Sequence, residues 1–387
     1  MRIAYLLVDP GIGLYGTKGA SVHVQEVIRG MRAAGHRVTV FCTRLDSAVP
    51  DDLADLRVVH LPVAKRLPVA DREAMIAAAG SALAAVAADA EFDLVYERYS
   101  LFSSAGAELA DQLEVPLVVE VNAPLVAEQR EHRELVDETA AWEATSRTFG
   151  RADRIGCVSR PVADWVREVA PEAASVTEVV PNGVNTERIR VADLESRQDA
   201  STVTVGFVGT LKPWHGTERL VRAVARVDTL LGTDRRVCLD VVGTGPEQES
   251  LVRLAEELGI ADRVRFRGAV APSEVPDILA TMDIAVAPYP YGDHYFSPLK
   301  VYEYLAAGLP VVASAIGEIP TLLDDGRLGV LVTPGEVDEL ATALAELARD
   351  GRRRVELGTA ARASAVAEHD WRIRCRDLLA PVPERIR

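Results

Sequence analysis

Short apolar runs alternate with longer helical patterns along the first half of the chain. The runs are rich in Val, Ile and Leu, as buried strands are, and the segments between them repeat apolar residues at helical spacing. This alternation predicts parallel strands joined by right-handed crossovers. The expected strands are Ile3–Val8, Val38–Cys42, Arg57–Leu61, Leu94–Glu97, Leu117–Val121 and Arg154–Val158, and the expected helices are Ser21–Ala34, Arg72–Ala88 and Leu125–Phe149.

The same alternation starts again after the turn cluster Pro181-Asn182-Gly183-Val184-Asn185 and a polar stretch that reaches Thr202. We therefore expect two doubly wound α/β domains, residues 1–182 and 183–370, facing each other across a cleft that binds the ligand. Residues 371–387 include a helical pattern at Trp371–Leu379, a candidate to cross back to the first domain. The second set of strands is Val203–Val208, Val237–Val242, Val264–Phe266, Ile284–Ala287, Val311–Ala313 and Gly329–Val332, with helices Gly216–Leu231, Pro246–Leu258, Pro298–Ala307 and Val337–Arg349.

Composition narrows the class of protein. Hydrophobic residues make up 48% of the 387 residues, which is ample for two cores, and the net charge is -15. That negative charge argues against nucleic acid as a partner and allows at most weak peripheral contact with an anionic membrane, for which only Lys65-Arg66 is a candidate. The N-terminal apolar run is too short for a signal peptide or a membrane helix. No feature indicates an oligomeric state.

The cysteines and lysines are few and scattered. Because the four cysteines contain no CxxC pair, neither a disulfide framework nor a zinc site is indicated, and a reducing cytoplasm is expected. Lysine occurs only at Lys18, Lys65, Lys212 and Lys300, among many arginines. The neighbourhood of each lysine therefore carries information.

Two turns of the second half have the composition of phosphate sites. Strand Val203–Val208 runs into Gly209 and then Lys212 and His215 before a helix, so that the backbone can approach a ligand and the helix start offers N–H groups to an anion. Gly243-Thr244-Gly245 repeats this arrangement after the next strand. Its third dinucleotide-fingerprint position is Gln248 instead of Gly, which argues against a Rossmann oxidoreductase.

A third candidate anion site lies before the helix expected at Pro298–Ala307. Ser297 is expected to cap this helix with Pro298 in its first turn, so that the N–H groups of Leu299 and Lys300 point outward beside the lysine. Glu303, one turn further on, could accept hydrogen bonds from sugar hydroxyls or pair with Lys300 on the surface.

Four segments together resemble the GT-B glycosyltransferases of family 4, the retaining class that uses nucleotide sugars. The segments are EYLAAGLPVVAS, VVPNGVN, VVGTGPEQESL and GTKGASVHVQEVIRGMRAAGHRVTV, and the resemblance covers nearly the whole chain. It implies a GT-B fold of two Rossmann-like domains and transfer of a sugar from a nucleoside diphosphate to an acceptor. It also implies that the C-terminal domain holds most of the donor and that no metal or other cofactor is required.

The resemblance assigns roles to individual residues and shows two departures. Glu303 matches the second Glu of the family's E-x7-E motif, which binds the nucleotide ribose, whereas Tyr295 stands where the first Glu contacts the donor sugar. The family's Arg and Lys pair aligns with Thr210 and His215, which leaves Lys212 and Lys300 as the cations for the diphosphate. We interpret the SPLK-x2-EY stretch as the mark of a subgroup with a variant of this motif.

The remaining predicted site residues are distributed over both halves. Gly243, Phe266 and Gly268 are expected on the donor side, the last two beside the base. In the first half, His23 is expected to pack or cap rather than catalyse. The loop residues are Gly16, Lys18 and Gly19, near the donor phosphates and acceptor; Asn122 ends a strand where many relatives have a His near the transferred sugar; and Glu97, Arg98 and Tyr99 are expected on the acceptor side.

The sequence thus predicts a retaining glycosyltransferase that acts on a small soluble acceptor, with secondary metabolites among the candidates. The mechanism needs no general base, because the leaving diphosphate can take the acceptor's proton while Lys212, Lys300 and Asn122 stabilise charge and position the reactants. One alternative is assembly of polysaccharide or lipid-linked saccharide. A binding protein without catalysis, to which Tyr295, Thr210 and His215 would point, and an epimerase using His294 are the others.

Overall fold

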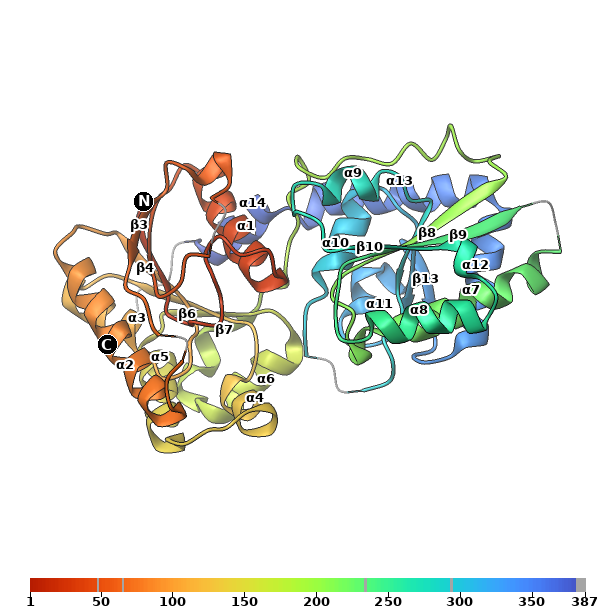
Figure 1. Ribbon diagram of the computed structural model, residues 1–387. Helices are drawn as coiled ribbons and strands as arrows, with labels where there is room; N and C mark the ends of the chain where they lie inside the picture. The colour runs from red at the N-terminus through yellow and green to blue at the C-terminus, as the bar shows by residue number, and fades with distance from the viewer. Residues whose placement is uncertain (47–48, 65, 233–234, 293–294, 381–387) are drawn as a thin grey trace. The chain divides into compact units, whose positions relative to one another are not determined.

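The computed structural model describes residues 1–46, 49–64, 66–232, 235–292 and 295–380 (Figure 1). The chain divides into two compact units. The N-terminal unit comprises Met1–Asn182, the short segment Tyr295–Ser297 and the C-terminal residues from Trp371. The C-terminal unit comprises the chain from Gly183 onward without that segment, as far as Asp370. Each unit is a parallel sheet covered by helices, which confirms the expected pair of Rossmann-like domains.

The described strands of the N-terminal unit form one parallel sheet in the order β3-β2-β1-β4-β5-β6-β7. Its central strands are buried along their whole length, as expected for a parallel sheet covered on both faces. The strands are β1 (Arg2–Leu7), β2 (Arg37–Cys42), β3 (Arg57–His60), β4 (Leu94–Arg98), β5 (Leu117–Val121), β6 (Arg154–Cys157) and β7 (Thr177–Val179).

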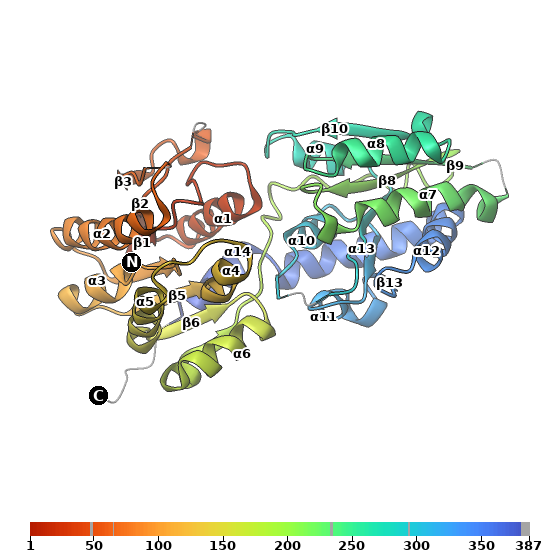
Figure 2. The same cartoon turned by 60° about the horizontal axis from the view of Figure 1, so that its bottom comes forward.

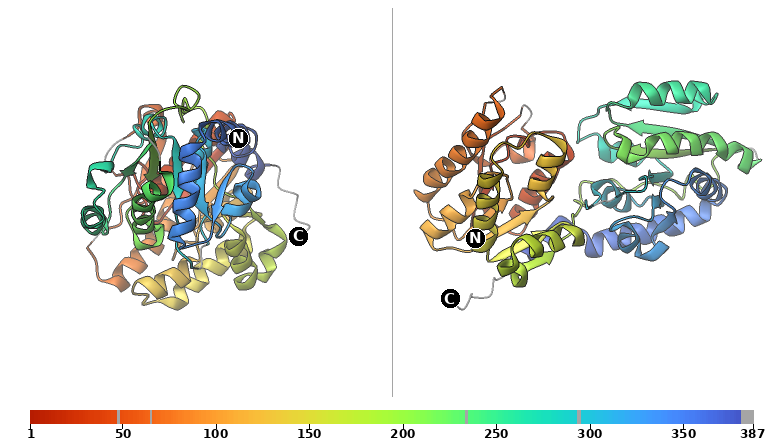
Figure 3. Two further views of the ribbon diagram at one scale, coloured as in Figure 1. Left: turned by 90° about the vertical axis from the view of Figure 1, so that its right-hand side faces the viewer. Right: turned by 90° about the horizontal axis from the view of Figure 1, so that it is seen from below.

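Helices from both ends of the chain cover this sheet. The C-terminal helix α14 packs against α1, so that blue and red ribbons lie side by side in Figures 1 and 3. Apolar residues of α2, α3, α5 and α6 join the main core of the unit. The helices are α1 (Gly19–Ala33), α2 (Val69–Ala88), α3 (Ala105–Leu113), α4 (Leu125–His132), α5 (Glu138–Arg151), α6 (Arg160–Val169) and α14 (Trp371–Leu378).

The single helix predicted for Leu125–Phe149 is wrong, because the chain breaks between α4 and α5. Two carboxylates stabilise the break. Asp137 caps α5 by accepting from the N–H of Ala140 at 2.9 Å, and the buried Glu73 accepts from the N–H groups of Val136 and Asp137 at 3.0 and 2.8 Å. Because Glu73 comes from α2, local sequence could not reveal it.

The described strands of the C-terminal unit form a second parallel sheet in the order β10-β9-β8-β11-β12-β13. Apolar residues of α7, α8 and α12 pack with β8 and β9 in its core, and α7 and α12 lie side by side in Figure 2. The strands are β8 (Thr202–Val208), β9 (Arg236–Val242), β10 (Val264–Gly268), β11 (Ile284–Ala287), β12 (Val311–Ser314) and β13 (Gly329–Val332). The helices are α7 (Thr217–Leu231), α8 (Gln248–Glu257), α9 (Val275–Leu279), α10 (Leu299–Ala306), α11 (Ile319–Leu322), α12 (Val337–Arg349) and α13 (Gly351–Glu368).

Two chemical features of the described residues bear on the sequence analysis. The cysteines Cys42, Cys157, Cys238 and Cys375 are all free thiols. Among the described helices, none combines the length and the apolar composition needed to cross a membrane.

Candidate functional site

Hydrogen bonds join the loops that follow β8, β9 and β10 at the carboxyl ends of these adjacent strands. The N–H of Gly209 donates to the carbonyl of Val242 at 2.9 Å, and the N–H of Leu211 donates to Thr244 at 2.9 Å. The N–H of Gly243 in turn donates to the carbonyl of Gly268 at 2.8 Å. The predicted donor residues Gly209, Gly243 and Gly268 therefore lie on three adjacent strand ends.

Glycine is required at two of these positions. The backbone φ angles of Gly209 and Gly243 are 152° and 125°, values that residues with a side chain rarely adopt. A Cβ on Gly243 would lie 1.9 Å from the carbonyl oxygen of Gly209, and a Cβ on Gly209 would lie 2.9 Å from the Nζ of Lys300. The absence of side chains thus lets the loops meet each other and lets the lysine reach the backbone.

Lys300, on the first turn of α10, has a buried ammonium group. Its Nζ lies 4.3 Å from the ring centre of Phe207 and 5.2 Å from that of Tyr289, and it finds no hydrogen-bond partner among the described residues. Burial lowers the pKa of Lys300 to about 7, an effect that the carboxylate of Glu303 partly opposes. A buried donor without a partner costs free energy in the protein as it stands.

Two other predicted residues join this cluster and one does not. The ring of His215 lies 6.1 Å from Phe207 and 6.0 Å from Tyr289, and its Nδ1 contacts the carbonyl of Thr210. The exposed Thr210 follows Gly209 directly. Lys212 instead lies over the exposed ring of Trp214, with its Nζ 5.3 Å from the ring centre.

The predicted start of α10 needs correction. The helix begins at Leu299, Pro298 occupies its cap position, and no side chain caps it. Ser297 instead bonds to Asn182: its Oγ accepts from the N–H of Asn182 at 3.1 Å, and its carbonyl accepts from the Asn182 side chain at 2.8 Å. The tertiary contact with Asn182 has taken the hydroxyl that would otherwise cap the helix.

Glu303 and Phe266 lie where the sequence analysis placed them along the chain. Glu303 is half-buried on α10, one helical turn after Lys300. Phe266 is partly buried on β10, and the register of that strand shifts between Phe266 and Gly268. Both side chains are partly exposed.

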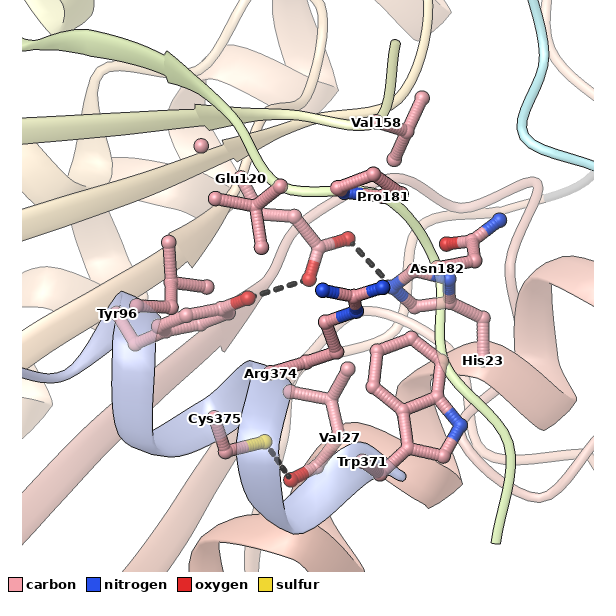
Figure 4. A pocket seen from close by; sticks show the side chains of 13 residues that line it. His23, Val27, Tyr96, Glu120, Val158, Pro181, Asn182, Trp371, Arg374 and Cys375 are labelled. Carbon is pink, nitrogen blue, oxygen red and sulfur yellow. Dashed lines mark hydrogen bonds and ion pairs between the residues drawn. The ribbon is translucent and has the colours of Figure 1, made fainter. Parts of the chain in front are cut away.

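In the N-terminal unit, the buried carboxylate of Glu120 connects four side chains, of which Figure 4 shows Tyr96 and His23. It accepts hydrogen bonds from Arg98 at 2.6 Å and from Tyr96 and Asn122, and its Oε1 lies 2.9 Å from Nε2 of His23. Desolvation by burial would raise the pKa of Glu120, but His23 and Arg98 outweigh it and the pKa is lowered. This network holds the amide of Asn122 at the end of β5.

Residues of helix α14 pack beside this network of hydrogen bonds. Trp371 stacks edge to face on His23 at 5.0 Å, and both Trp371 and Arg374 line a cavity of about 20 Å³ beside Glu120 (Figure 4). That volume suffices for one water molecule. His23 is therefore a packed residue of this network, in the kind of position that the sequence analysis expected.

Other predicted residues of the N-terminal unit separate into buried and exposed sets. Glu97 and Tyr99 point into the core: Glu97 is fully buried and accepts from the N–H of Gly106 at 3.1 Å, and Tyr99 bonds to Thr145 at 2.6 Å. Glu97 lies on the central strand β4, which is buried along its whole length, and Tyr99 follows that strand directly. Lys18 and Gly19 are exposed where α1 begins, and Gly16 lies close to Ser21.

Two predicted residues, Lys65 and His294, lie outside the described residues. Two other residues, which the sequence analysis did not single out, bond to predicted site residues. Glu120 interrupts the apolar run Leu117–Val121, and a buried acid within a strand is the signal that could have found it. Glu128, on α4, is the hydrogen-bond partner of the Tyr295 hydroxyl, a contact that no local pattern predicts.

Comparison with known proteins extends these observations. Residues 17–188 match the family model "Glycosyltransferase Family 4", and residues 202–350 match "Glycosyl transferases group 1". D-inositol 3-phosphate glycosyltransferase of Corynebacterium aurimucosum is 28% identical over 392 residues, which cover 93% of this chain and 91% of that protein. GDP-mannose-dependent alpha-(1-6)-phosphatidylinositol monomannoside mannosyltransferase of Mycobacterium tuberculosis is 34% identical over 211 residues, covering 51% and 53% of the two chains.

The solved structures agree on the fold. Sucrose-phosphate synthase from Thermosynechococcus elongatus superposes with a TM-score of 0.74 and 22% identity, covering 98% of this chain and 97% of its own. Both halves of the chain thus match glycosyltransferase models, and both sheets have the topology that this fold requires. The chain belongs to the GT-B glycosyltransferases of family 4 and is a nucleotide-sugar-dependent transferase.

Proposed function

We propose that this protein transfers a sugar, with retention of configuration, from a nucleoside diphosphate sugar to a small soluble acceptor. The observation that carries the proposal is the buried Nζ of Lys300, which lies beside the Gly209 backbone and has no hydrogen-bond partner among the residues that the structure describes. A diphosphate would supply the hydrogen-bond acceptors that this ammonium group lacks. Glu303, one turn along α10, would then accept from the ribose hydroxyls.

The proposed chemistry needs no carboxylate nucleophile. The bond between the sugar carbon and the diphosphate breaks, the acceptor oxygen bonds to the same face of that carbon, and the acceptor proton passes to the leaving diphosphate. Lys300, with Lys212 and the N–H groups at the start of α7, would stabilise the negative charge that develops on the diphosphate. Because these groups carry the charge, we propose that transfer requires no metal.

The subgroup and the acceptor are also proposals. SPLK-x2-EY would mark members in which Tyr295 replaces the first Glu of the family motif and Lys300 provides the main phosphate cation. The relative from Corynebacterium aurimucosum is named for a small soluble inositol phosphate, which favours a small acceptor here. The relative from Mycobacterium tuberculosis is named for a phosphatidylinositol mannoside, and for this reason a lipid-linked acceptor is the second candidate.

A two-stage experiment tests the proposal. A thermal-shift screen with UDP, GDP and dTDP first identifies the nucleotide, because a ligand that binds only the native state raises the melting temperature. The corresponding nucleotide sugars are then incubated with inositol phosphates, with other small alcohols and with a phosphatidylinositol glycolipid, and the products are analysed. Transfer to a small alcohol supports the proposal. Transfer to the glycolipid alone means that the acceptor is lipid-linked and that the proposed small acceptor is wrong. Nucleotide binding without any transfer indicates a binding protein, and an altered free nucleotide sugar indicates an epimerase.

A further inference from the structure

The last residues of strand β8 have different neighbours on their two sides. On one side, pairing with β9 continues as far as Val208, and the N–H of Gly209 donates to the carbonyl of Val242 at 2.9 Å. On the other side, pairing with β11 ends at Gly206 within the described residues. Because successive N–H groups of a strand point to opposite sides, the N–H of Val208 faces the side on which the strand partner has ended.

A tyrosine of helix α10 accepts from this N–H in place of a strand. The hydroxyl of Tyr304 accepts a hydrogen bond from the N–H of Val208 at 2.8 Å, and the Tyr304 side chain is buried. A buried N–H without an acceptor is costly, so the bond stabilises the fold. It also ties α10 to the end of β8 at a defined distance.

The same face of α10 carries Lys300. Residues four apart in a helix lie side by side on its surface, and Tyr304 is four residues after Lys300. The Nζ of Lys300 lies 4.3 Å from the ring centre of Phe207 and 2.9 Å from the place that a Cβ on Gly209 would take. Two successive turns of α10 thus contact three consecutive residues, Phe207, Val208 and Gly209.

The contacts of the Lys300 ammonium group do not fix its position by themselves. Its Nζ finds no hydrogen-bond partner among the described residues. Attraction to the rings of Phe207 and Tyr289 acts over several ångströms and defines the place of the charge only loosely. A hydrogen bond, in contrast, holds donor and acceptor within a range of about 0.5 Å. Because no side chain caps the start of α10, the position of Lys300 depends on where the bond of Tyr304 holds the helix.

We propose that Tyr304 is a positioning residue for Lys300: its hydroxyl sets the height of α10 over the end of β8 and so places the ammonium group at the Gly209 backbone. Every residue involved belongs to the C-terminal unit. The effect on turnover rests on the proposed function, in which Lys300 meets the diphosphate. Misplacement of such a group by about 1 Å costs on the order of 100-fold in rate. A tyrosine that only satisfied the Val208 N–H would affect stability but not Lys300.

The small number of lysines allows a direct measurement on Lys300 in the free protein. The chain has only four lysines, so NMR of protein labelled with carbon-13 at lysine Cε shows few signals, and the signal that is missing in Lys300→Met belongs to Lys300. The variants are Tyr304→Phe, which removes only the hydroxyl, and the matched control Tyr302→Phe at another buried position of α10. Titration of the Lys300 signal gives its pKa in each protein.

We expect the Lys300 signal to titrate near pH 7 in the unmodified protein and in Tyr302→Phe. In Tyr304→Phe, α10 is released from β8 and water reaches the amine, so the midpoint moves towards the ordinary value of lysine. A midpoint that Tyr304→Phe leaves unchanged overturns the inference, whether or not the protein transfers sugar. An equal shift in Tyr302→Phe also overturns it, because the effect would not be specific. If Tyr304→Phe does not fold, 3-fluorotyrosine at position 304 keeps the ring and weakens the oxygen as an acceptor, and the same comparison applies.

Steady-state kinetics then connect the placement to the reaction. Tyr304→Phe should lower kcat by about 10-fold with a smaller change in KM, whereas Tyr302→Phe should keep the turnover of the unmodified protein. Added to Lys300→Met, Tyr304→Phe should cost less than about twofold, because its effect passes through Lys300. A full loss in that background overturns the inference. A shifted Lys300 midpoint without any change in turnover, or in a protein that transfers no sugar, counts against the proposed function and supports the placement of Lys300 by Tyr304.

Discussion

Each unit of this protein buries a charged side chain near the carboxyl ends of its strands, but the two side chains differ in how many protein groups bond to them. In the N-terminal unit, Glu120 is bonded by Tyr96, Arg98 and Asn122 and also contacts His23, so the protein itself satisfies the charge. In the C-terminal unit, the Nζ of Lys300 lies against the rings of Phe207 and Tyr289 and finds no hydrogen-bond partner among the described residues.

The pKa directions express the same difference. The partners of Glu120 lower its pKa and keep it ionised, whereas burial lowers the pKa of Lys300 and favours its neutral form. A charge that is fully bonded stabilises and orients its neighbours, such as Asn122. A charge without partners destabilises the free protein, which makes it suited to binding a ligand of opposite charge. Five experiments test this contrast.

The largest effect is expected when the satisfied charge is removed. Glu120→Ala leaves the guanidinium of Arg98 buried and unpaired, and this should cost about 3–5 kcal/mol of the free energy of unfolding. Denaturant unfolding, followed by a signal from the N-terminal unit, measures it. Lys300→Met is the control, because removing an unsatisfied charge should leave stability unchanged or raise it. An equal loss of unfolding free energy in both variants would mean that the two buried charges do not differ in how well the protein satisfies them.

Removing the unsatisfied charge should instead affect catalysis. Lys300→Met keeps the packing of the side chain but removes its charge, and we expect turnover to fall on the order of 100-fold with a smaller change in substrate binding. Steady-state kinetics measure both. Lys212→Met should show the same pattern less strongly, since its side chain lies over exposed Trp214. A raised KM with intact turnover would make Lys300 a ground-state clamp.

The neighbour of Lys300 should contribute to binding rather than to turnover. Glu303→Ala removes a charged acceptor for two ribose hydroxyls and should weaken nucleoside diphosphate affinity by about 1.5–3 kcal/mol while the fold survives. Isothermal titration calorimetry measures the affinity, and circular dichroism checks the fold. An unchanged affinity would remove Glu303 from the nucleotide site.

Binding of the diphosphate should depend on pH through Lys300. Because the pKa of Lys300 is about 7 in the free protein, the group is protonated below that pH and neutral above it. A bound diphosphate raises this pKa, so binding above pH 7 takes up a proton and the affinity falls towards pH 9, by no more than the loss of affinity that Lys300→Met causes. Glu303, Tyr289 and His215 are the other titratable groups around it.

Calorimetry between pH 7.5 and 9, in two buffers of different ionisation enthalpy, measures the proton uptake directly. Lys300→Met should abolish both the uptake and the slope. If the slope persisted in that variant, another group would be responsible for it.

The smallest effect is expected from metal removal. The cations proposed for the diphosphate belong to the protein, so transfer activity should be unchanged in excess EDTA. Loss of activity that Mn²⁺ or Mg²⁺ restores would contradict the proposal and would mean that a metal, rather than Lys300, carries the diphosphate charge.

The sequence by itself determined the order of elements and the type of each sheet. Short apolar runs such as Leu94–Tyr96 and Ile284–Ala287 indicate strands buried on both faces, and the glycines after β8 and β9 mark close backbone approaches. These features are local, because hydrophobic spacing and backbone conformation act over a few residues. The resemblance then indicated the nucleotide side of the site.

Only the tertiary structure decided which polar groups meet. Glu73 of α2 bonds to the break between α4 and α5, where a single helix was predicted. The hydroxyl of Ser297 bonds to Asn182 instead of capping α10, and the hydroxyl of Tyr295 bonds to Glu128. The tertiary structure also showed that Glu97 and Tyr99 are buried, whereas the Nζ of Lys300 has no hydrogen-bond partner in the part of the chain that the structure describes. Each of these outcomes depends on hydrogen bonds between residues far apart in the chain, and whether a buried polar group is satisfied is a property of the packed molecule, not of its local pattern.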